Sequence, residues 1–177
     1  DGEGKERYSD LAVDARAIAK DTHGKDSNDY HFFVIAFKKI YNGWSGRGSI
    51  GSGEGYKGFD SSVTWLNGSE MDSRVFAHEI GHNLGLWHAG SWEVPTNESQ
   101  ADASSGSHVE YGFYYDTMGS TWRKTLDQLQ FNSHFKNLND WIPDNQIQNV
   151  TGNYSGRIYA SDQTLVTGRN YAIKIDA

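Results

Sequence analysis

Three histidines and one glutamate lie close together in this chain, at spacings that suit a metal site. Residues 78–88 read HEIGHNLGLWH, with His78 and His82 four residues apart and Glu79 directly after the first histidine. Residues four apart lie on the same face of a helix, so these two imidazoles can bind one ion. Glu79 projects beside them, close enough to hold a water molecule without itself binding the metal. This pattern is typical of metal-assisted hydrolysis.

Gly85 and His88 complete the pattern. A glycine can take the left-handed conformation that ends a helix, and the turn at Gly85 then returns His88 to the same ion. Three neutral imidazoles and one water are the usual ligands of a catalytic zinc ion, whereas a structural site fills its fourth position with a protein group. The chain has no cysteine, which excludes thiolate ligands, disulfides and a cysteine nucleophile. We predict one zinc ion held by His78, His82 and His88, with Glu79 as general base.

The metal-binding residues need a helix, and the sequence supplies its limits. Either Ser69 or Asp72 is a suitable N-cap, and Gly85 ends the predicted helix. Residues 62–66 predict a short strand before it, because the segment contains β-branched and aromatic residues and is followed by the turn sequence Asn67-Gly68.

The remaining elements follow from hydrophobic periodicity. Residues 6–22 predict an amphipathic helix. The continuous apolar segment 32–37 predicts a strand that is buried on both faces, at the centre of a sheet. The polar residues 90–108 predict a long surface segment. From residue 126 to Trp141, apolar positions predict a second helical segment that ends before Pro143.

Residues 149–177 differ in character from the rest, because aromatic and β-branched residues alternate there with turn residues. We interpret them as short strands, the opening hairpins of a β-rich module. The sequence therefore predicts a main domain at 1–148 and a β-rich C-terminal extension at 149–177.

Composition excludes several classes of function. The 177 residues include 16 Lys and Arg against 23 Asp and Glu, for a net charge of −7. Binding to nucleic acid backbones requires clustered positive charge, so we expect no nucleic acid partner. No apolar segment approaches the roughly 20 residues that a membrane-spanning helix needs, so we expect no membrane partner. We also expect a monomer.

The full pattern HExxHxxGxxH resembles that of the metzincin zinc peptidases, which carry a methionine in a turn beneath the metal. Residues 116–120, with the sequence DTMGS, place Met118 at the matching position. Within the metzincins, the sequence is most similar to those of the gametolysin-type peptidases. The segments that carry this similarity are GWSG at 43–46, TWLNG at 64–68, HA at 88–89 and DTMGS at 116–120. The resemblance covers roughly residues 5–145.

This resemblance implies an α+β fold, the α/β/α-like catalytic domain of the metzincins. Its twisted, mostly parallel sheet has one antiparallel edge strand, with a long zinc-binding helix and a C-terminal helix, followed here by short strands. It also implies a secreted zinc endopeptidase that cleaves extracellular polypeptides, in which Glu79 activates a zinc-bound water and Met118 packs under the imidazoles.

The resemblance further implies substrate contacts. The strand at 62–66 would be the sheet edge that pairs with an extended substrate, which places Thr64 and Trp65 in contact with it. Ser120 follows the methionine turn and would help to wall the pocket for a substrate side chain. Tyr115 is a further candidate for contact with the substrate.

Two other functions fit the same residues. One is a zinc amidase acting on cell-wall or glycoprotein substrates, and the other is a non-catalytic binding module stabilised by zinc. The Asp- and Asn-rich segment 97–102 is a candidate for Ca²⁺, which prefers oxygen ligands.

Overall fold

A computed structural model describes residues 3–40, 42–51, 61–68, 72–95, 105–120 and 129–175. The chain divides into two compact units, residues 1–126 and residues 127–177. Among the described residues, no helix combines the length and the apolar character needed to cross a membrane.

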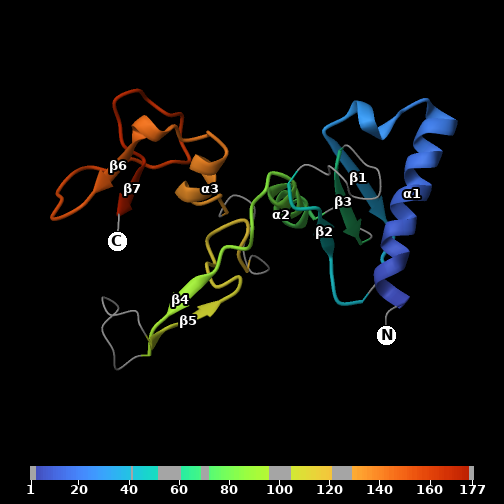
Figure 1. Cartoon of the computed structure of the whole chain (residues 1–177), viewed down its shortest axis with the longest axis horizontal. Coiled ribbons are helices and arrows are strands. Elements are labelled where there is room, and N and C mark those ends of the chain that lie inside the picture. The colour runs from blue at the N-terminus through green and yellow to red at the C-terminus, as the bar shows by residue number, and fades with distance from the viewer. Residues whose placement is uncertain are drawn as a thin grey trace. The chain divides into compact units, whose positions relative to one another are not determined.

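The first unit contains a small sheet between two helices (Figure 1). Strand β3 (Ser62–Asn67) lies in the middle of the sheet, parallel to β1 (Phe32–Phe37) and antiparallel to β2 (Gly46–Gly48). Helix α1 (Glu3–His23) covers one face of the sheet, and helix α2 (Ser73–Asn83) packs against β2 and β3. This arrangement confirms the predicted mixed α/β fold, in a small sheet with one parallel and one antiparallel pair of strands. A 3-10 turn, η1, spans Ser27–Asp29 between α1 and β1.

The hydrophobic core lies between α1 and the sheet. Successive side chains of a strand point to opposite faces, so Val63 and Trp65 of β3 point together toward α1, where they pack with Ala12 and Ile35. The indole N–H of Trp65 also donates a hydrogen bond to the backbone carbonyl of Tyr8 at 2.9 Å. Helix α1 and the central strand are therefore joined by apolar packing and by one long-range hydrogen bond.

Two expectations about the sheet need correction. Strand β1 is not at the centre and is not buried on both faces, since Phe32 and Val34 are 42% and 38% exposed. The reason is that α2 packs mainly against β2 and β3, so the described residues cover the alternate side chains of β1 only in part. Strand β3, in turn, is not the exposed edge, because β2 occupies that position.

The predicted surface segment after the metal motif contains a hairpin. Strand β4 (Ser91–Glu93) pairs antiparallel with β5 (Ser107–Val109), with Ser91 opposite Val109. The hairpin extends away from α2 in Figure 1. Because β4 begins at Ser91, the base of the hairpin lies close to His88 along the chain.

The second unit contains helix α3 (Ser133–Leu138), which begins at Asn132, where the side-chain oxygen accepts the Phe135 amide at 2.9 Å. The helix is shorter than predicted, and residues 121–128 lie outside the description. A 3-10 turn, η4 (Asp144–Gln146), leads into β6 (Ile147–Val150).

Strand β6 pairs with β7 (Ala172–Ile175) in parallel. The hairpin interpretation of this region is therefore wrong, because two strands joined by a tight turn must be antiparallel. The predicted domain boundary after residue 148 falls inside β6. The division into a catalytic domain at 1–148 and a C-terminal extension at 149–177 stays a prediction.

Candidate metal centre

Helix α2 carries the first two histidines of the motif. It begins after Asp72, whose side chain accepts a hydrogen bond from the Arg74 amide at 2.9 Å, so the predicted N-cap is confirmed. The helix ends at Asn83, and Gly85 has a φ of 86°, in the left-handed region. That conformation suits glycine because it has no Cβ to collide with the backbone. The helix limits and the turn that leads to His88 are therefore as predicted.

The three histidine rings meet at one point. One ring nitrogen from each of His78, His82 and His88 lies within 4.8 Å of the other two. The ring centroids of His82 are 4.9 Å from those of both His78 and His88. Among the described residues, this is the one group of three or more metal-ligating side chains close enough to share an ion.

Hydrogen bonds fix which nitrogen of each ring faces the others. The Nδ1–H of His78 donates to the Thr117 carbonyl at 2.9 Å, and that of His82 donates to the Leu86 carbonyl at 2.8 Å. Because a carbonyl can only accept, Nδ1 carries the proton in both rings and Nε2 keeps its lone pair.

His88 has a different kind of partner. Its Nδ1 lies 2.5 Å from a carboxylate oxygen of Glu110. A carboxylate also accepts the Nδ1 proton, which again leaves Nε2 as the free nitrogen. In all three rings Nδ1 is engaged by its hydrogen-bond partner, so Nε2 is the nitrogen left to face the common point.

Burial keeps the rings of α2 neutral. Desolvation lowers the pKa of His78 to about 4, against the opposing effect of the bond to Thr117. Burial also lowers the pKa of His82. Neutral imidazole is the form that binds a metal ion. At neutral pH, then, neither ring has to lose a proton before binding.

These observations test whether zinc fits the site. Zinc in catalytic sites takes three protein ligands and one water, and each ligating histidine donates its other N–H to a carbonyl or carboxylate. The three rings here meet both conditions, and the described residues bring no fourth metal-ligating side chain into the group. The donor set therefore fits a zinc ion with one open position.

Glu79 follows His78 in α2 and lines the same cleft as that histidine. Its side chain is buried, and this burial raises the pKa of its carboxyl group to about 8, with the Arg47 charge acting in the opposite direction. A general base works best with a pKa near the operating pH. Burial thus makes Glu79 a stronger base than an exposed carboxylate.

Met118 lies in a tight turn directly after Thr117, whose carbonyl accepts the His78 bond. The turn is closed by a hydrogen bond from the Gly119 amide to the Asp116 carbonyl at 2.9 Å. The Asp116 carboxylate accepts the Met118 amide at 2.6 Å, and the Met118 side chain is fully buried. Since the preceding carbonyl, that of Thr117, holds His78, this turn is one wall of the metal centre.

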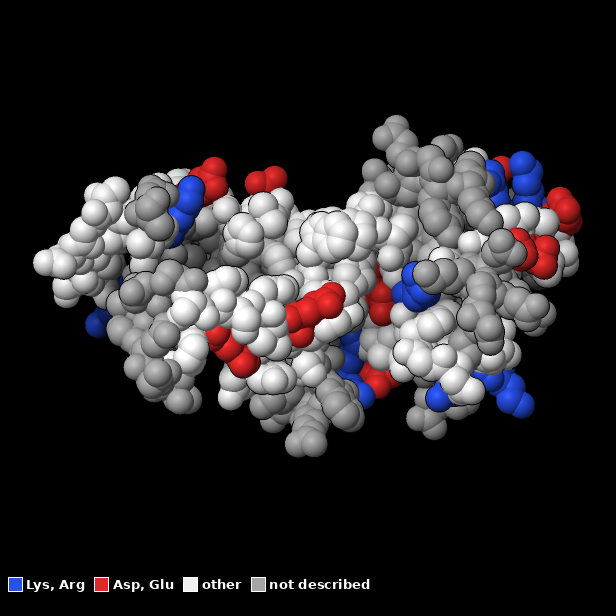
Figure 2. Space-filling view, turned by 60° about the horizontal axis from the view of Figure 1, so that its bottom comes forward, with Lys and Arg blue, Asp and Glu red and all other residues white. Residues whose placement is uncertain are grey.

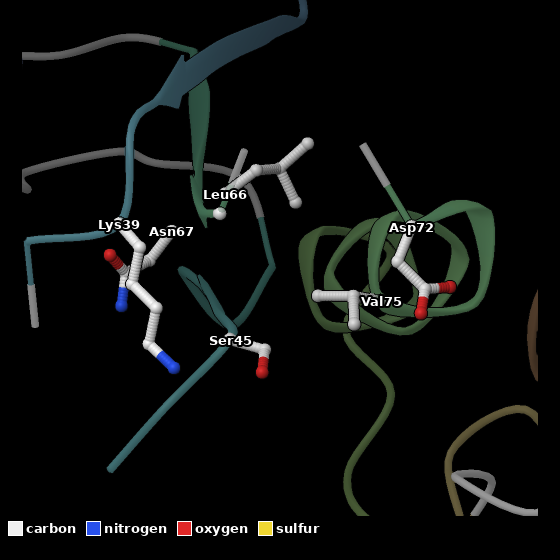
Figure 3. A pocket seen from close by; sticks show the side chains of 7 residues that line it. Lys39, Ser45, Leu66, Asn67, Asp72 and Val75 are labelled. Carbon is white, nitrogen blue, oxygen red and sulfur yellow. The ribbon is translucent and has the colours of Figure 1, made fainter. Parts of the chain in front are cut away.

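A cleft of about 560 Å³ opens over the centre. It is lined by residues 43–46, by Val75, His78 and Glu79 of α2, by Glu110, Tyr111 and Tyr114, and by Gly119 and Ser120. A second recess of about 270 Å³ lies beside it and shares Ser45 and Val75 with it (Figure 3). Figure 2 shows acidic and basic side chains scattered over one face, with no continuous basic area among the residues drawn in colour.

The predicted substrate contacts fall in different places. Ser120 lines the cleft, as expected. Thr64 and Trp65 do not, because both are buried inside the unit, Thr64 bonded to Asn83 of α2 at 2.7 Å and Trp65 packed against α1. Tyr115 is not among the lining residues, although its neighbour Tyr114 is. The burial of Thr64 and Trp65 therefore argues against the expected contact of their side chains with the substrate, whereas contact of the exposed Tyr115 with the substrate stays a prediction.

Sequence reasoning missed Glu110. The residue follows the hairpin and lies 22 positions from His88, and no motif marked it. The candidate calcium segment 97–102 lies outside the described residues, and nothing in the described part supports calcium.

Comparison with known proteins was consistent with this geometry. Residues 3–89 match the profile of a family described as Metallo-peptidase family M12B, reprolysin-like. The matched segment contains the three histidines and Glu79 and ends before Met118. No curated protein and no solved structure gave a significant match. Together with the three-histidine site, the match supports a metzincin-like zinc metallopeptidase without singling out the gametolysin type.

Proposed function

We propose that this chain is a zinc-dependent endopeptidase that hydrolyses internal peptide bonds of extracellular proteins. The observation that carries the proposal is the arrangement at α2 and His88. Three imidazoles whose Nδ1 atoms are held by other partners come together at one point, and Glu79 lines the cleft next to His78. The reprolysin-like match over residues 3–89 supports the same chemistry.

The residues of the site divide the chemistry between them. When bound, zinc supplies a Lewis acid that lowers the pKa of its water from 15.7 to about 7. Glu79 accepts a proton from the attacking water through its carboxylate and later delivers that proton to the departing amine nitrogen. His78, His82 and His88 hold the ion, and the fixed acceptors at their Nδ1 atoms keep the rings oriented.

The substrate is best placed along the edge of the sheet that β2 forms. Gly46, the first residue of β2, and the three residues before it line the cleft next to Glu79. An extended peptide can add to such an edge through main-chain hydrogen bonds. Ser120 would wall the cleft on the opposite side, and the recess in Figure 3 has room for a further substrate residue next to Ser45 and Val75.

The finer assignments belong to the same proposal. The resemblance of residues 43–46, 64–68 and 116–120 to the gametolysin type supports that branch of the metzincins, with Met118 as the turn methionine. It also supports a secreted enzyme with its catalytic domain at residues 1–148, and we propose that this enzyme is a monomer.

Digestion of denatured casein by the purified chain tests this function. We expect internal cleavage, detected by mass spectrometry of the products. A chelator should stop cleavage, and adding zinc back should restore it. Release of peptides from cell-wall fragments, with the glycan chains left intact, by a chain that does not cleave casein would instead show the amidase function. A zinc-loaded chain that leaves both substrates intact would refute the proposal.

A further inference from the structure

The third histidine of the metal centre is held differently from the first two. The Nδ1–H groups of His78 and His82 donate to backbone carbonyls, of Thr117 and Leu86. The positions of these two acceptors are fixed because both belong to the main chain. The Nδ1 of His88 instead meets the side chain of Glu110, at 2.5 Å. The orientation of His88 therefore depends on side chains from elsewhere in the sequence.

Glu110 belongs to a tight turn directly after β5. The amide of Gly112 donates to the Val109 carbonyl at 3.1 Å, which closes a four-residue turn with Glu110 and Tyr111 at its two central positions. Gly112 is needed for close approach to the other strand, since a Cβ there would lie 2.0 Å from Ser91 Oγ of β4. The β4–β5 hairpin thus determines where this turn lies.

Tyr111 contacts His88 from a second direction. Its ring centroid lies 3.7 Å from that of His88 and 6.0 Å from that of His78. Tyr111 has a φ of 62°, a left-handed conformation that is uncommon for residues other than glycine. Its carbonyl accepts the Ser120 amide at 2.9 Å, which ties this conformation to the segment after Met118.

We propose that Glu110 and Tyr111 are positioning residues for the third metal ligand, with Glu110 orienting His88 through Nδ1 and the Tyr111 ring packing against its face. The proposal rests on the proposed zinc site. Carboxylate partners of ligating histidines fix the tautomer and raise the basicity of the ligand. Metal affinity then depends on the hairpin turn, although neither residue binds the ion.

Zinc affinity of the full chain tests the role of Glu110. The zinc is removed with a chelator, and Zn²⁺ is titrated back in competition with a fluorescent zinc indicator. We expect Glu110→Ala to weaken zinc binding by about 10- to 100-fold, the usual effect of losing such a partner. Glu110→Gln should fall between parent and Ala, because its amide oxygen still accepts the Nδ1 proton. The control Glu93→Ala, which removes an exposed carboxylate from β4 of the same hairpin, should bind zinc as the parent does.

Tyr111 is tested by the same titration. Tyr111→Phe keeps the ring and should keep the affinity, whereas Tyr111→Ala should weaken it several-fold. A second measurement is the visible absorption of the cobalt-substituted chain, which we expect to change in Glu110→Ala and to stay unchanged in Glu93→Ala. Unfolding of the metal-free variants serves as the folding control, and the 62% exposure of the Glu110 side chain predicts little change.

The outcomes separate this proposal from the proposed function. If the parent binds zinc and cleaves casein while Glu110→Ala and Glu110→Gln bind zinc as tightly as the parent, the positioning role is overturned and the peptidase function stands. If the parent itself binds no zinc, both proposals fail. Graded affinity in the order parent, Gln, Ala supports the positioning role even if Glu110→Ala also unfolds at a lower temperature, because Glu110→Gln retains the hydrogen bond.

Discussion

A methyl group added to strand β2 should have different consequences at Gly46 and at Gly48. Both glycines lie where β2 packs against α2. A Cβ at position 48 would lie 2.5 Å from the backbone oxygen of Glu79 and 3.0 Å from His82 Cβ. A Cβ at position 46 would instead meet side chains, at 2.5 Å from Val75 Cγ1 and 2.6 Å from Glu79 Oε1. Side chains can rotate away, but a helix backbone cannot.

The size of each effect follows from this contrast. Overpacking a close contact costs about 1–3 kcal/mol, and replacing glycine by alanine returns about 0.4–1 kcal/mol by restricting the unfolded chain. For Gly48→Ala we expect a net loss of about 2 kcal/mol, because strand and helix must separate, which lowers Tm by about 4–8 °C. Gly46→Ala should lose less stability but more activity, because a displacement of about 1 Å in a catalytic group can lower the rate about 100-fold.

Thermal unfolding followed by circular dichroism, with chelator present, measures the stability of each variant, and casein cleavage in excess zinc measures activity. The control is Gly152→Ala, where a Cβ would meet nothing within 4 Å; its Tm should lie within about 1–2 °C of the parent, as for surface changes in general. If Gly48→Ala unfolds at the parent's temperature, or if Gly46→Ala cleaves casein at the parent's rate, the described packing of β2 on α2 is wrong.

Two further changes test the supports of α2. Asp72→Ala removes the N-cap and should cost about 1 kcal/mol at pH 7 in urea unfolding. The hydrogen bond from the Arg74 side chain lowers the pKa of Asp72 below its ordinary value of 3.8. The stability that the Asp72 carboxylate contributes is therefore present above pH 3.8 and is lost as the pH falls through the lower pKa of the folded state. An equal difference in stability between parent and variant at pH 2 and pH 7 would contradict this role of Asp72. Thr64→Val leaves the buried Asn83 side-chain oxygen without its 2.7 Å hydrogen bond. We expect the free energy of unfolding in urea to fall by about 1–3 kcal/mol. A variant as stable as the parent would show that this bond does not hold β3 to α2.

Local patterns predicted the centre of this structure well. The spacing of His78, His82 and Gly85 is a property of one helix and its end, and the N-cap at Asp72 depends on a hydrogen bond two residues away. Such short-range features depend on residues that are close together in the sequence, so the sequence alone can predict them. The mixed α/β fold was also predictable, since helical and strand periodicities can be recognised separately.

Features that depend on distant pairing were not predictable in the same way. The order of the strands in the sheet, with β3 in the middle, is decided by contacts between segments far apart in the chain. An apolar segment such as 32–37 is equally compatible with burial on one face or on two, because the pattern does not say how far α2 extends over the sheet. Glu110 was missed as the partner of His88 for the same reason. The two residues are 22 positions apart, and the pairing of β4 with β5 brings Glu110 close to His88.

The most direct test of the central claim compares the parent with Glu79→Gln, both loaded with zinc and assayed for metal content and casein cleavage. Glutamine keeps the size of the side chain but cannot take a proton from water. We predict that the variant holds one zinc ion per chain, as the parent does, and loses turnover by several orders of magnitude. A zinc-loaded Glu79→Gln that cleaves casein at the rate of the parent would contradict the assignment of Glu79 as the base, and with it the proposed mechanism.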